Sequence, residues 1–460
     1  MLRKARSAAV GVVALCLLMP VTTAQADTSP YRPGSQGLGD PYFPKAGNGG
    51  YDVKHYDLGI DYTPATHRLK AIARITATAT QNLSRFDLDY SGPTISRVLV
   101  NGRRAVYRRA GQELVITPSH GLPKGSTFTV VVDYAGSPKT MKNKALGEYG
   151  WIYTKDGAVT LAEPDAARAW YPANDHPSDK ATYTFHLTTP SDVTALANGE
   201  RDRVTAVRNG RSTVTWRMRK PMAAYLAMVA IGRFKVKESR AGGLPNLTAY
   251  DPANNGDDGG LHGTTGKAIA WEAKRFGPYP FGSIGGIVDD LKVQYALETQ
   301  GRPVYGLYAA DATIVHENAH QWFGDSVSLK SWRDIWLNEG FATYAEWMWD
   351  EAHGGRSPAK FYAGLYQRDA SDTFWDLKTG DPGRDGMFDY EAVYVRGAMT
   401  LQALRDRIGD EAFFTLLRDW TAKYRYGNAG TRDFIDLAEQ VSGQDLTALF
   451  DAWLYQAAKP

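Results

Sequence analysis

The chain carries two histidines and two glutamates at the spacing of a catalytic metal site. His316 and His320 are four residues apart, Glu317 lies between them, and eighteen residues separate His320 from Glu339. On a helix that rises about 1.5 Å per residue, the two imidazoles lie one turn apart on the same face. Two imidazoles in that arrangement can share one zinc ion, and Glu317 is then placed to polarise a bound water. Catalytic zinc needs a third protein ligand and an open fourth position, and Glu339 is the candidate for the third ligand.

A chance match and a structural zinc site are the alternatives. A His-Glu-x-x-His string also arises by accident in a chain with nine histidines, and many such strings lie on solvated helix faces. Structural zinc sites usually close the fourth position with Cys or His. Chance does not explain an acidic residue inside the aromatic, helix-forming segment Trp336–Phe341. The residue six positions after His320 is Ser326, which excludes the metzincin class, because that class requires a histidine there. The pattern therefore indicates a metallopeptidase.

The length and composition indicate a soluble globular protein with more than one domain. A chain of 460 residues exceeds what one ordinary core accommodates. Hydrophobic residues make up 43% of the chain and charged residues 22%, as in ordinary globular proteins. Without the first 26 residues, which include Arg3, Lys4 and Arg6, the chain has 50 basic and 50 acidic side chains. This balance gives no electrostatic argument for binding to nucleic acid or to a membrane.

Residues 1–26 have the pattern of a secretory signal peptide. A basic start is followed by an apolar run from Ala8 to Val21 and by an Ala-Gln-Ala sequence that ends at Ala26. The run is too short to span a bilayer comfortably, so we expect cleavage after Ala26 and secretion, with an uncleaved anchor as the alternative. The only cysteine, Cys16, lies in this run, so the mature chain would contain no disulfide. No second apolar stretch of spanning length follows, and we expect a released protein without stable membrane association.

The rest of the chain divides into a lead-in and two regions of different patterning. Residues 27–50 are rich in Gly, Pro and Ser and are predicted to be extended. Residues 51–240 alternate between apolar and polar positions, as in His55–Tyr62 and Phe128–Tyr134, and this period predicts strands. The Asn-Gly pair at 101–102 predicts a tight hairpin turn, because both residues tolerate a positive φ.

Residues 241–460 carry helical periodicity instead. A short apolar run at Ile284–Val288 predicts one strand beside the metal site. We therefore predict an α+β multidomain fold, in which an antiparallel β-sandwich or saddle precedes a mostly helical domain that holds the metal. The predicted helices are Gly263–Phe276, Thr313–Asp325, Asp334–Glu351, Val393–Ile408 and Thr431–Val441.

The two metal-binding segments resemble those of a known family. The sequences HENAHQWFGD at residues 316–325 and WLNEGFA at residues 336–342 are similar to the signature of the aminopeptidase N and leukotriene-epoxide hydrolase family of gluzincins. The resemblance extends from Tyr42 to the C-terminus. It implies a β-rich N-terminal domain followed by a thermolysin-like catalytic domain. It also implies one zinc ion per chain, with His316, His320 and Glu339 as its ligands and Glu317 as the general base.

A tyrosine downstream of the metal site matches a second family segment. Tyr394 begins the sequence Tyr-Val-Arg-Gly, which is similar to the family's Tyr-x-Lys-Gly. The family's tyrosine donates a hydrogen bond to the oxyanion of the tetrahedral intermediate, so the resemblance implies the same role for Tyr394. The alternative is that an aromatic residue on an amphipathic helix only packs in the core.

A third segment bears on how a substrate is held. Glu298 lies in the sequence Tyr-Ala-Leu-Glu-Thr, which resembles the family's Gly-x-Met-Glu-Asn. The resemblance implies that Glu298 binds the substrate's free amino group and that Ala296 and Leu297 also contact the substrate. Tyr295 and Thr299 replace the family's glycine and asparagine, and Tyr295 is expected to crowd the substrate backbone or to reshape the first side-chain pocket. An ordinary surface glutamate is the alternative for Glu298.

Glu163 is the second candidate for binding the amino group. It matches the position from which the family's β domain reaches into the active site, where relatives place Glu or Gln. The resemblance implies that Glu163 and Glu298 hold the amine together. Asp165 lies close by in sequence, and a structural role at the surface is the alternative for Glu163.

The expected function is that of a secreted zinc aminopeptidase acting on peptides with a free N-terminus. One alternative is a metallopeptidase without that restriction, because Tyr295 and Thr299 depart from the family pattern. Epoxide hydrolysis and a catalytically silent binding module are further alternatives, although a silent module should have lost Glu317, a zinc ligand or Tyr394. The chain stops after the segment 450–455, so we expect a cleft that is more open than in longer relatives or is roofed by a partner subunit. The oligomeric state stays open.

Overall fold

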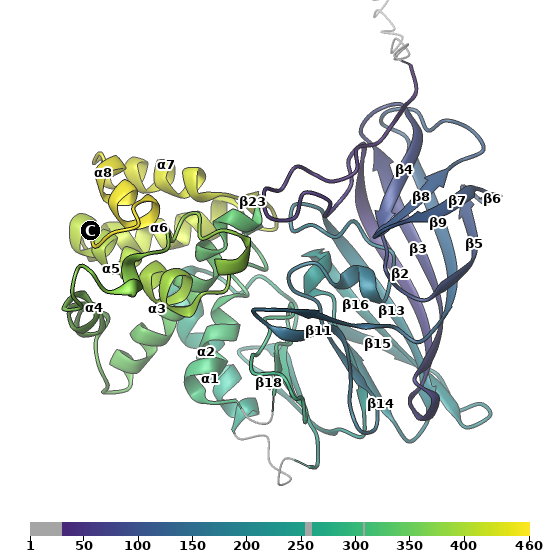
Figure 1. Cartoon of the computed structure of the whole chain (residues 1–460). Helices are drawn as coiled ribbons and strands as arrows, with labels where there is room; N and C mark the ends of the chain where they lie inside the picture. The colour runs from purple at the N-terminus through teal and green to yellow at the C-terminus, as the bar shows by residue number, and fades with distance from the viewer. Residues whose placement is uncertain (1–29, 254–259, 307–308) are drawn as a thin grey trace, which may run out of the picture.

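The computed structural model describes residues 30–253, 260–306 and 309–460, and Figure 1 shows a β-rich half beside a helical half. The signal peptide predicted at residues 1–26 lies outside the described residues. The β-rich half comes first in the chain, and the helical half contains the C-terminus (Figure 1). The predicted α+β class, with a mostly β domain followed by a mostly helical one, is confirmed.

The largest sheet has eight strands and forms the body of the β-rich half. Its first two strands in sequence pair antiparallel over their whole length, from Tyr51 opposite Ala79 to Thr63 opposite Arg68. Tyr56, Leu58 and Ile60 alternate with exposed or half-exposed residues and are at most 2% exposed, as expected of a strand with one buried face. In sheet order the strands are β15 (Glu200–Val204), β16 (Arg211–Ala223), β13 (Lys180–Pro190), β2 (Tyr51–Thr63), β3 (Arg68–Ala79), β9 (Thr127–Gly136), β5 (Thr94–Val100) and β6 (Arg103–Arg104).

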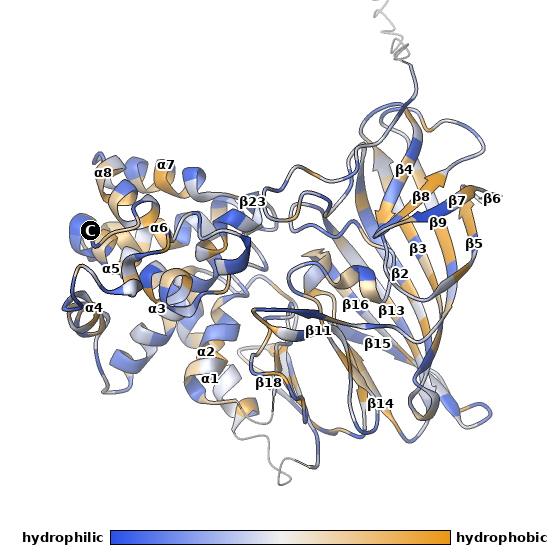
Figure 2. Ribbon diagram, viewed as in Figure 1, coloured by the Kyte–Doolittle hydropathy of each residue, from blue (hydrophilic) through white to orange (hydrophobic). Residues whose placement is uncertain are grey.

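Two smaller sheets complete the β-rich half. Figure 2 shows that apolar residues follow the strands, as expected where sheets bury one face against another. One sheet contains β1 (Arg32–Pro33), β4 (Leu83–Asp89), β8 (Glu113–Thr117) and β7 (Val106–Ala110). The other contains β10 (Thr140–Asn143), β11 (Gly147–Tyr153), β12 (Ala158–Leu161), β17 (Val229–Gly232) and β14 (Thr194–Ala197).

The second half combines a four-stranded sheet with helices. The strand predicted at Ile284–Val288 is present as β20, and it pairs parallel with both of its neighbours. The sheet order is β18 (Lys235–Ala241), β19 (Leu244–Tyr250), β20 and β21 (Val304–Tyr305). Because β18 ends at Ala241 and pairs with β19, the sheet includes residues on both sides of the predicted domain boundary at 240/241, which stays a prediction.

All five predicted helices are present with shifted ends, and the structure adds helices at Pro358–Tyr366, Asp410–Lys423 and Thr447–Phe450 that were not predicted. None of the helices in the described part of the chain combines the length and apolarity needed to cross a membrane. A two-stranded pair, β22 (Ser328–Leu329) and β23 (Asn428–Ala429), joins distant parts of this half. The helices are α1 (Leu261–Phe276), α2 (Asp311–Ala319), α3 (Trp336–Ala352), α4 (Pro358–Tyr366), α5 (Arg396–Ile408), α6 (Asp410–Lys423), α7 (Thr431–Ser442) and α8 (Thr447–Phe450), with π-helical turns at Tyr390–Val395 and Asp451–Tyr455.

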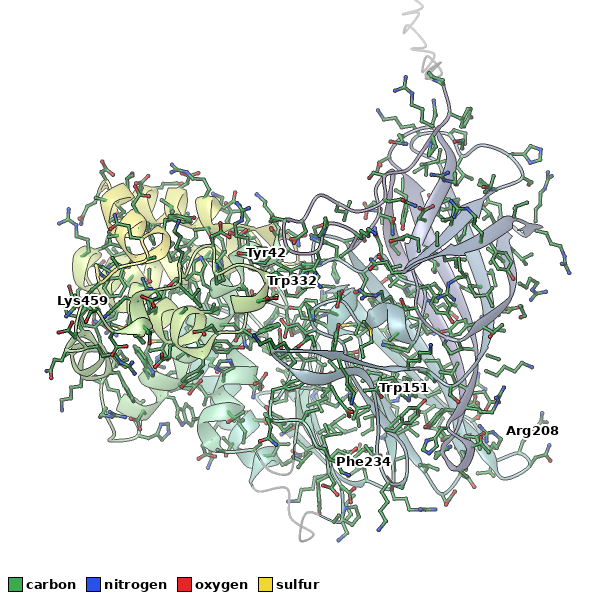
Figure 3. The ribbon with its side chains drawn as sticks, viewed as in Figure 1. Tyr42, Trp151, Arg208, Phe234, Trp332 and Lys459 are labelled. Atoms are coloured by element: carbon green, nitrogen blue, oxygen red, sulfur yellow. The ribbon has the colours of Figure 1, made fainter. Side chains whose placement is uncertain are left out.

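Residues 30–50, the described part of the lead-in, link the two halves of the molecule. The buried carboxylate of Asp40 accepts hydrogen bonds from the backbone N–H of Trp332, at 2.8 Å, and from Ser331 Oγ, at 2.9 Å. Tyr42 donates to Asp381 Oδ1 at 2.5 Å, and Phe43 packs edge-on against Trp332 with ring centroids 6.2 Å apart. Figure 3 shows Tyr42 and Trp332 close together where the halves meet. These contacts fix the turn that leads into α3.

Candidate active site

The first two candidate metal ligands come from α2 and from the turn that ends it. The helix ends at Ala319, so His320 is its C-cap, although its φ of −57° and ψ of −24° are still helical. The predicted continuation of the helix to Asp325 is wrong. The chain turns at Gly324, whose φ of +128° is unfavourable for residues with a Cβ. His316 and His320 are 9% and 1% exposed, so both imidazoles lie at the base of a cavity instead of on a solvated face.

Helix α3 brings Glu339 to the two histidines. Glu339 Oε2 lies 3.2 Å from His316 Nε2 and 3.4 Å from His320 Nε2. The next residue, Gly340, lets α3 approach α5 closely, because a Cβ at this position would lie 2.8 Å from Gly397 Cα. Two glycines in contact therefore set the distance between α3 and α5, and the same contact holds Glu339 near the segment that precedes α5.

The other ring nitrogen of each histidine is already occupied. His316 Nδ1 lies 2.6 Å from Glu346 Oε1, and His320 Nδ1 lies 3.0 Å from the carbonyl oxygen of Phe323. With Nδ1 donating, each Nε2 directs its lone pair toward Glu339. A tetrahedral zinc ion with bonds of about 2.0–2.1 Å needs ligand atoms about 3.3 Å apart, which is close to the observed 3.2 and 3.4 Å. The three side chains therefore fit one zinc ion.

The electrostatics of the three ligands favour a cation as well. Burial lowers the pKa of His316, but the hydrogen bonds to Glu339 and Glu346 outweigh it and raise that pKa well above its usual value. The pKa of His320 is raised to about 9, where burial again opposes the charge and the Glu339 and Glu298 carboxylates favour it. Positive charge is thus stabilised at the point where the ligand atoms meet, and a divalent ion supplies it without protonating either imidazole.

Glu317 lies in the same cavity, beside both histidines. It is 6% exposed, and burial raises its pKa to about 8, with the Glu298 and Glu339 carboxylates acting in the same direction and the histidines opposing them. A carboxyl whose pKa lies near neutral pH is suited to take up a proton and to release it again. A cation bound at the ligands would add a further charge that favours its ionised form.

Glu298 and Glu163 are two buried carboxylates that face the cavity from different halves. Glu298 is 2% exposed, and its Oε1 accepts a hydrogen bond from Tyr225 Oη at 3.3 Å. Glu163 follows β12, is 6% exposed, and has an Oε1 without a hydrogen-bond partner. The pKa of each is raised, Glu163 by burial and then by Glu298, and Glu298 by burial. A cationic group placed between them would relieve both the repulsion and the missing hydrogen bond.

Tyr394 comes from the π-helical turn before α5. Asp389 caps this turn by accepting a hydrogen bond from the N–H of Ala392 at 2.8 Å. The Tyr394 ring lies nearly parallel to the His316 ring, with 5.9 Å between centroids and 16° between planes. Burial, and after it the Glu339 charge, raises the pKa of Tyr394 well above its usual value. The hydroxyl therefore stays protonated and can act as a hydrogen-bond donor at neutral pH.

One cavity of about 350 Å³ brings these side chains together. Of the residues singled out from the sequence, Ala296 lines the cavity but Leu297 does not. Leu297 exchanges backbone hydrogen bonds of 2.8 Å with Val304, which turns its side chain into the core, where it is 2% exposed. The lining residues are Leu146, Glu163, Gln294, Tyr295, Ala296, Glu298, Thr313, His316, Glu317, His320, Glu339, Glu346, Phe388, Tyr390 and Tyr394.

Sequence reasoning missed the groups that orient the site. Position in sequence alone favours Asp325 and Asn338, which flank the ligands, as the groups that orient the histidines. The acceptors in the structure are instead Glu346 and the backbone carbonyl of Phe323. Glu346 had a signal, since it lies seven residues, or two turns, after Glu339 on the same helix face. No signal in the sequence pointed to Gln321. In the structure its Nε2 donates to the Glu298 carbonyl at 3.1 Å, and its Oε1 accepts from Gly301 N–H at 2.6 Å.

Comparison with known proteins gives matches along most of the chain. Residues 52–226 match the Peptidase M1 N-terminal domain, and residues 305–453 match the Peptidase family M1 domain. Glutamyl aminopeptidase of Rattus norvegicus is 25% identical over 450 residues, which are 88% of this chain and 47% of the relative. Aminopeptidase N of Lactobacillus delbrueckii subsp. lactis is 27% identical over 447 residues, which are 88% of this chain and 51% of the relative. The chain thus spans about half the length of these relatives.

Solved structures of similar length match over nearly their whole extent. The crystal structure of an M1 zinc metallopeptidase from Deinococcus radiodurans is 30% identical, with a TM-score of 0.85, and the match covers 92% of this chain and 99% of that one. A mutant of the M1 zinc metallopeptidase from Deinococcus radiodurans, bound to a Tyr-ser-ala substrate, is 31% identical with a TM-score of 0.83, over 91% of this chain and 97% of that one.

Proposed function

The chain belongs to peptidase family M1, and from this premise we propose that it is a zinc-dependent aminopeptidase that removes single residues from free N-termini. The observation that carries the proposal is the meeting of two kinds of group in one cavity. Three ligand atoms of His316, His320 and Glu339 converge there, and the buried carboxylates of Glu298 and Glu163 face the same space. The first set suits one zinc ion, and the second suits an ammonium group.

The chain's own residues account for the proton transfers. A zinc ion held by His316, His320 and Glu339 would supply Lewis acidity, polarising the scissile carbonyl and acidifying the attacking water. Glu317 takes the proton from the attacking water at its carboxylate and passes it to the nitrogen of the leaving amine. Tyr394 Oη donates a hydrogen bond to the oxygen on which negative charge develops, in a cavity where a preorganised donor acts more strongly than in water.

The two remaining carboxylates decide the mode of cleavage. A protonated α-amine between Glu298 and Glu163 forms charge-assisted hydrogen bonds and provides a partner for the free Glu163 oxygen. An acylated amine carries no charge and leaves buried carboxylates poorly satisfied, at a cost of roughly 1–3 kcal/mol each. The site therefore favours exopeptidase action on free N-termini.

The second candidate function is a peptidase that does not require a free N-terminus, because Tyr295 and Thr299 depart from the family segment. Thr299 is fully buried, donates to the Arg302 carbonyl at 2.6 Å, and is not among the cavity-lining residues, so its side chain does not contact the amine site directly. Tyr295 lines the cavity, so this candidate depends on Tyr295 alone.

The test pairs aminoacyl-arylamides with their Nα-acetylated counterparts. The zinc-loaded protein should cleave the free-amine substrates, and Glu317→Gln should abolish this cleavage while zinc stays bound. Equal cleavage of both sets would leave a general metallopeptidase. No cleavage of either set, with one equivalent of zinc bound, would point to a silent binding module instead.

Secretion is a separate part of the proposal. It is supported by the basic start, the apolar run and the Ala-Gln-Ala sequence that ends at Ala26. Expression of the full chain in a secreting bacterial host should release a product whose N-terminus is Asp27. Retention of the intact N-terminus in the membrane fraction would favour the uncleaved anchor.

A further inference from the structure

One wall of the cavity comes from the β-rich half, at the tip of the β10–β11 hairpin. We propose that Tyr295 fastens this hairpin to the catalytic half, and that the fastened tip residue, Leu146, selects peptides whose first side chain is large and apolar. Tyr295 is then a positioning residue and Leu146 a specificity-determining one. The proposal rests on the proposed aminopeptidase function, and it names the substrate class that this function accepts.

The geometry of the hairpin places Leu146 at the cavity. The strands pair antiparallel from Thr140 opposite Gly150 to Asn143 opposite Gly147, so the turn consists of residues 144–146. Gly147 has a φ of +73°, which glycine adopts without strain, and Asn143 Oδ1 accepts a hydrogen bond from the N–H of Leu146 at 2.6 Å. These features turn Leu146 toward the space that also contains the zinc ligands. Figure 1 shows β11 extending from the β-rich half toward the helical half.

The outer part of the hairpin extends beyond the sheet that anchors it. Strand β12 pairs with β11 only from Gly150 onward, so Glu148 and Tyr149 have no strand partner on that side. Tyr295 contacts the hairpin at this point: its Oη donates to the Glu148 carbonyl at 2.8 Å, across 147 residues of sequence. On the same strand, Tyr149 Oη donates to Asp165 Oδ1 at 3.2 Å. The tip is therefore held from the catalytic half by Tyr295, and from its own half by Tyr149.

The Tyr295 hydroxyl stays protonated, so it remains a hydrogen-bond donor to the hairpin. Burial raises the pKa of Tyr295 far above its usual value, and the Glu163 charge acts in the same direction. Tyr295 thus lines the same cavity as Glu163 and also contacts the hairpin at Glu148. Glycine, which the family segment has at this position, offers neither a ring for the cavity wall nor a donor for the Glu148 carbonyl.

Part of the cavity lining is apolar or aromatic. Leu146, Phe388 and the rings of Tyr295 and Tyr390 line the cavity that also contains Glu163 and Glu298. The first side chain of a peptide is attached to the carbon that bears the amine, so it lies within reach of this wall when the two carboxylates hold the amine. A leucine or phenylalanine side chain would bury apolar area against Leu146, whereas an alanine methyl group is too short to do so.

The test measures selectivity as the ratio of kcat/KM for leucyl- and phenylalanyl-arylamide to that for alanyl-arylamide. Tyr295→Phe keeps the ring and removes the donor, and Leu146→Ala removes the tip side chain. Each should lower the ratio about tenfold, mostly through KM, as expected for the loss of one apolar contact in a pocket. The double variant should lower it no further, because Leu146 acts only while the hairpin is fastened.

Tyr153→Phe is the matched control. Tyr153 Oη donates to the Pro138 carbonyl at 2.6 Å, so this variant removes the same type of bond from the other end of the same hairpin. Tyr153 is not among the residues that line the cavity, and the ratio should stay at the wild-type value.

Three results would overturn the proposal. The first is a ratio within twofold of wild type for both Tyr295→Phe and Leu146→Ala. The second is a double variant whose selectivity ratio falls by the product of the two single-variant losses, because Tyr295 would then affect the substrate independently of Leu146. The third is an equal loss of selectivity in Tyr153→Phe, which would indicate a general effect of loosening the hairpin base.

Failure of the proposed function gives a different result. A wild-type protein that cleaves no free-amine substrate would refute the aminopeptidase, whatever the variants do. Selectivity would still be measured by calorimetric titration of Glu317→Gln protein, with and without Tyr295→Phe, using L-leucinamide and L-alaninamide as ligands. An equal preference for leucinamide in both proteins would refute the role of Tyr295 without any turnover.

Discussion

Replacing Glu346 removes the carboxylate that orients His316 toward the metal position. Glu346 Oε1 lies 2.6 Å from His316 Nδ1, and their side chains are 28% and 11% exposed. A hydrogen bond to a charged group contributes roughly 1.5–3 kcal/mol. Because Glu346 is partly open to water, we take the lower end, which corresponds to about a tenfold change in an equilibrium constant. Glu346→Ala should therefore weaken zinc binding about tenfold, at the lower end of what such supporting groups contribute.

The measurement is zinc affinity by competition with a chromophoric chelator, together with kcat/KM at saturating zinc. Glu346→Gln should fall between wild type and Glu346→Ala, because the amide oxygen still accepts the hydrogen bond but carries no charge. Glu351→Gln is the matched control, since Glu351 lies on the same helix and is exposed. Zinc affinity and kcat/KM within twofold of wild type for Glu346→Ala would refute the argument that this contact orients the ligand.

Three further predictions concern the other buried groups. Tyr394→Phe should lower kcat by about 10²–10³ at unchanged zinc content, and a similar loss of zinc would contradict an oxyanion role. Glu298→Gln should raise KM for free-amine arylamides by about ten- to hundredfold, and an unchanged KM would show that the amine binds elsewhere. Burial, and after it the Asp89 charge, raises the pKa of Glu113 from 4.5 to about 8. The folded state therefore binds more protons than the unfolded state between these values, so this group's contribution to stability falls as the pH rises from 4.5 to 8. In denaturant titrations, Glu113→Gln should reduce the loss of unfolding free energy between pH 4.5 and 8 by on the order of 2–4 kcal/mol. Parallel profiles of unfolding free energy against pH for variant and wild type would contradict this.

The meeting of the two candidate histidine ligands could be predicted from the sequence because it is a local property. Four residues on a helix return a side chain to the same face whatever surrounds the helix, and this holds for His316 and His320 even though His320 is the C-cap. The change from two-residue alternation to helical periodicity likewise predicted the order of the β-rich and helical halves. The prediction extended α2 too far: the helix ends at Ala319, and the positive φ of Gly324, which a glycine in a sequence permits but does not require, excludes a helix that continues to Asp325.

The site as a whole was decided by tertiary structure, because its parts come from elements that do not neighbour one another in sequence. Glu163 and Leu146 belong to the β-rich half, and they reach the zinc ligands only because the halves pack together. The pairing of Leu297 with Val304 turns that side chain away from the cavity, although the motif alone predicts a substrate contact. Spacing along a helix determines which side chains can share a metal ion. The position of Leu146 in the cavity lining depends instead on the packing of a hairpin against Tyr295, through a hydrogen bond between residues 147 positions apart.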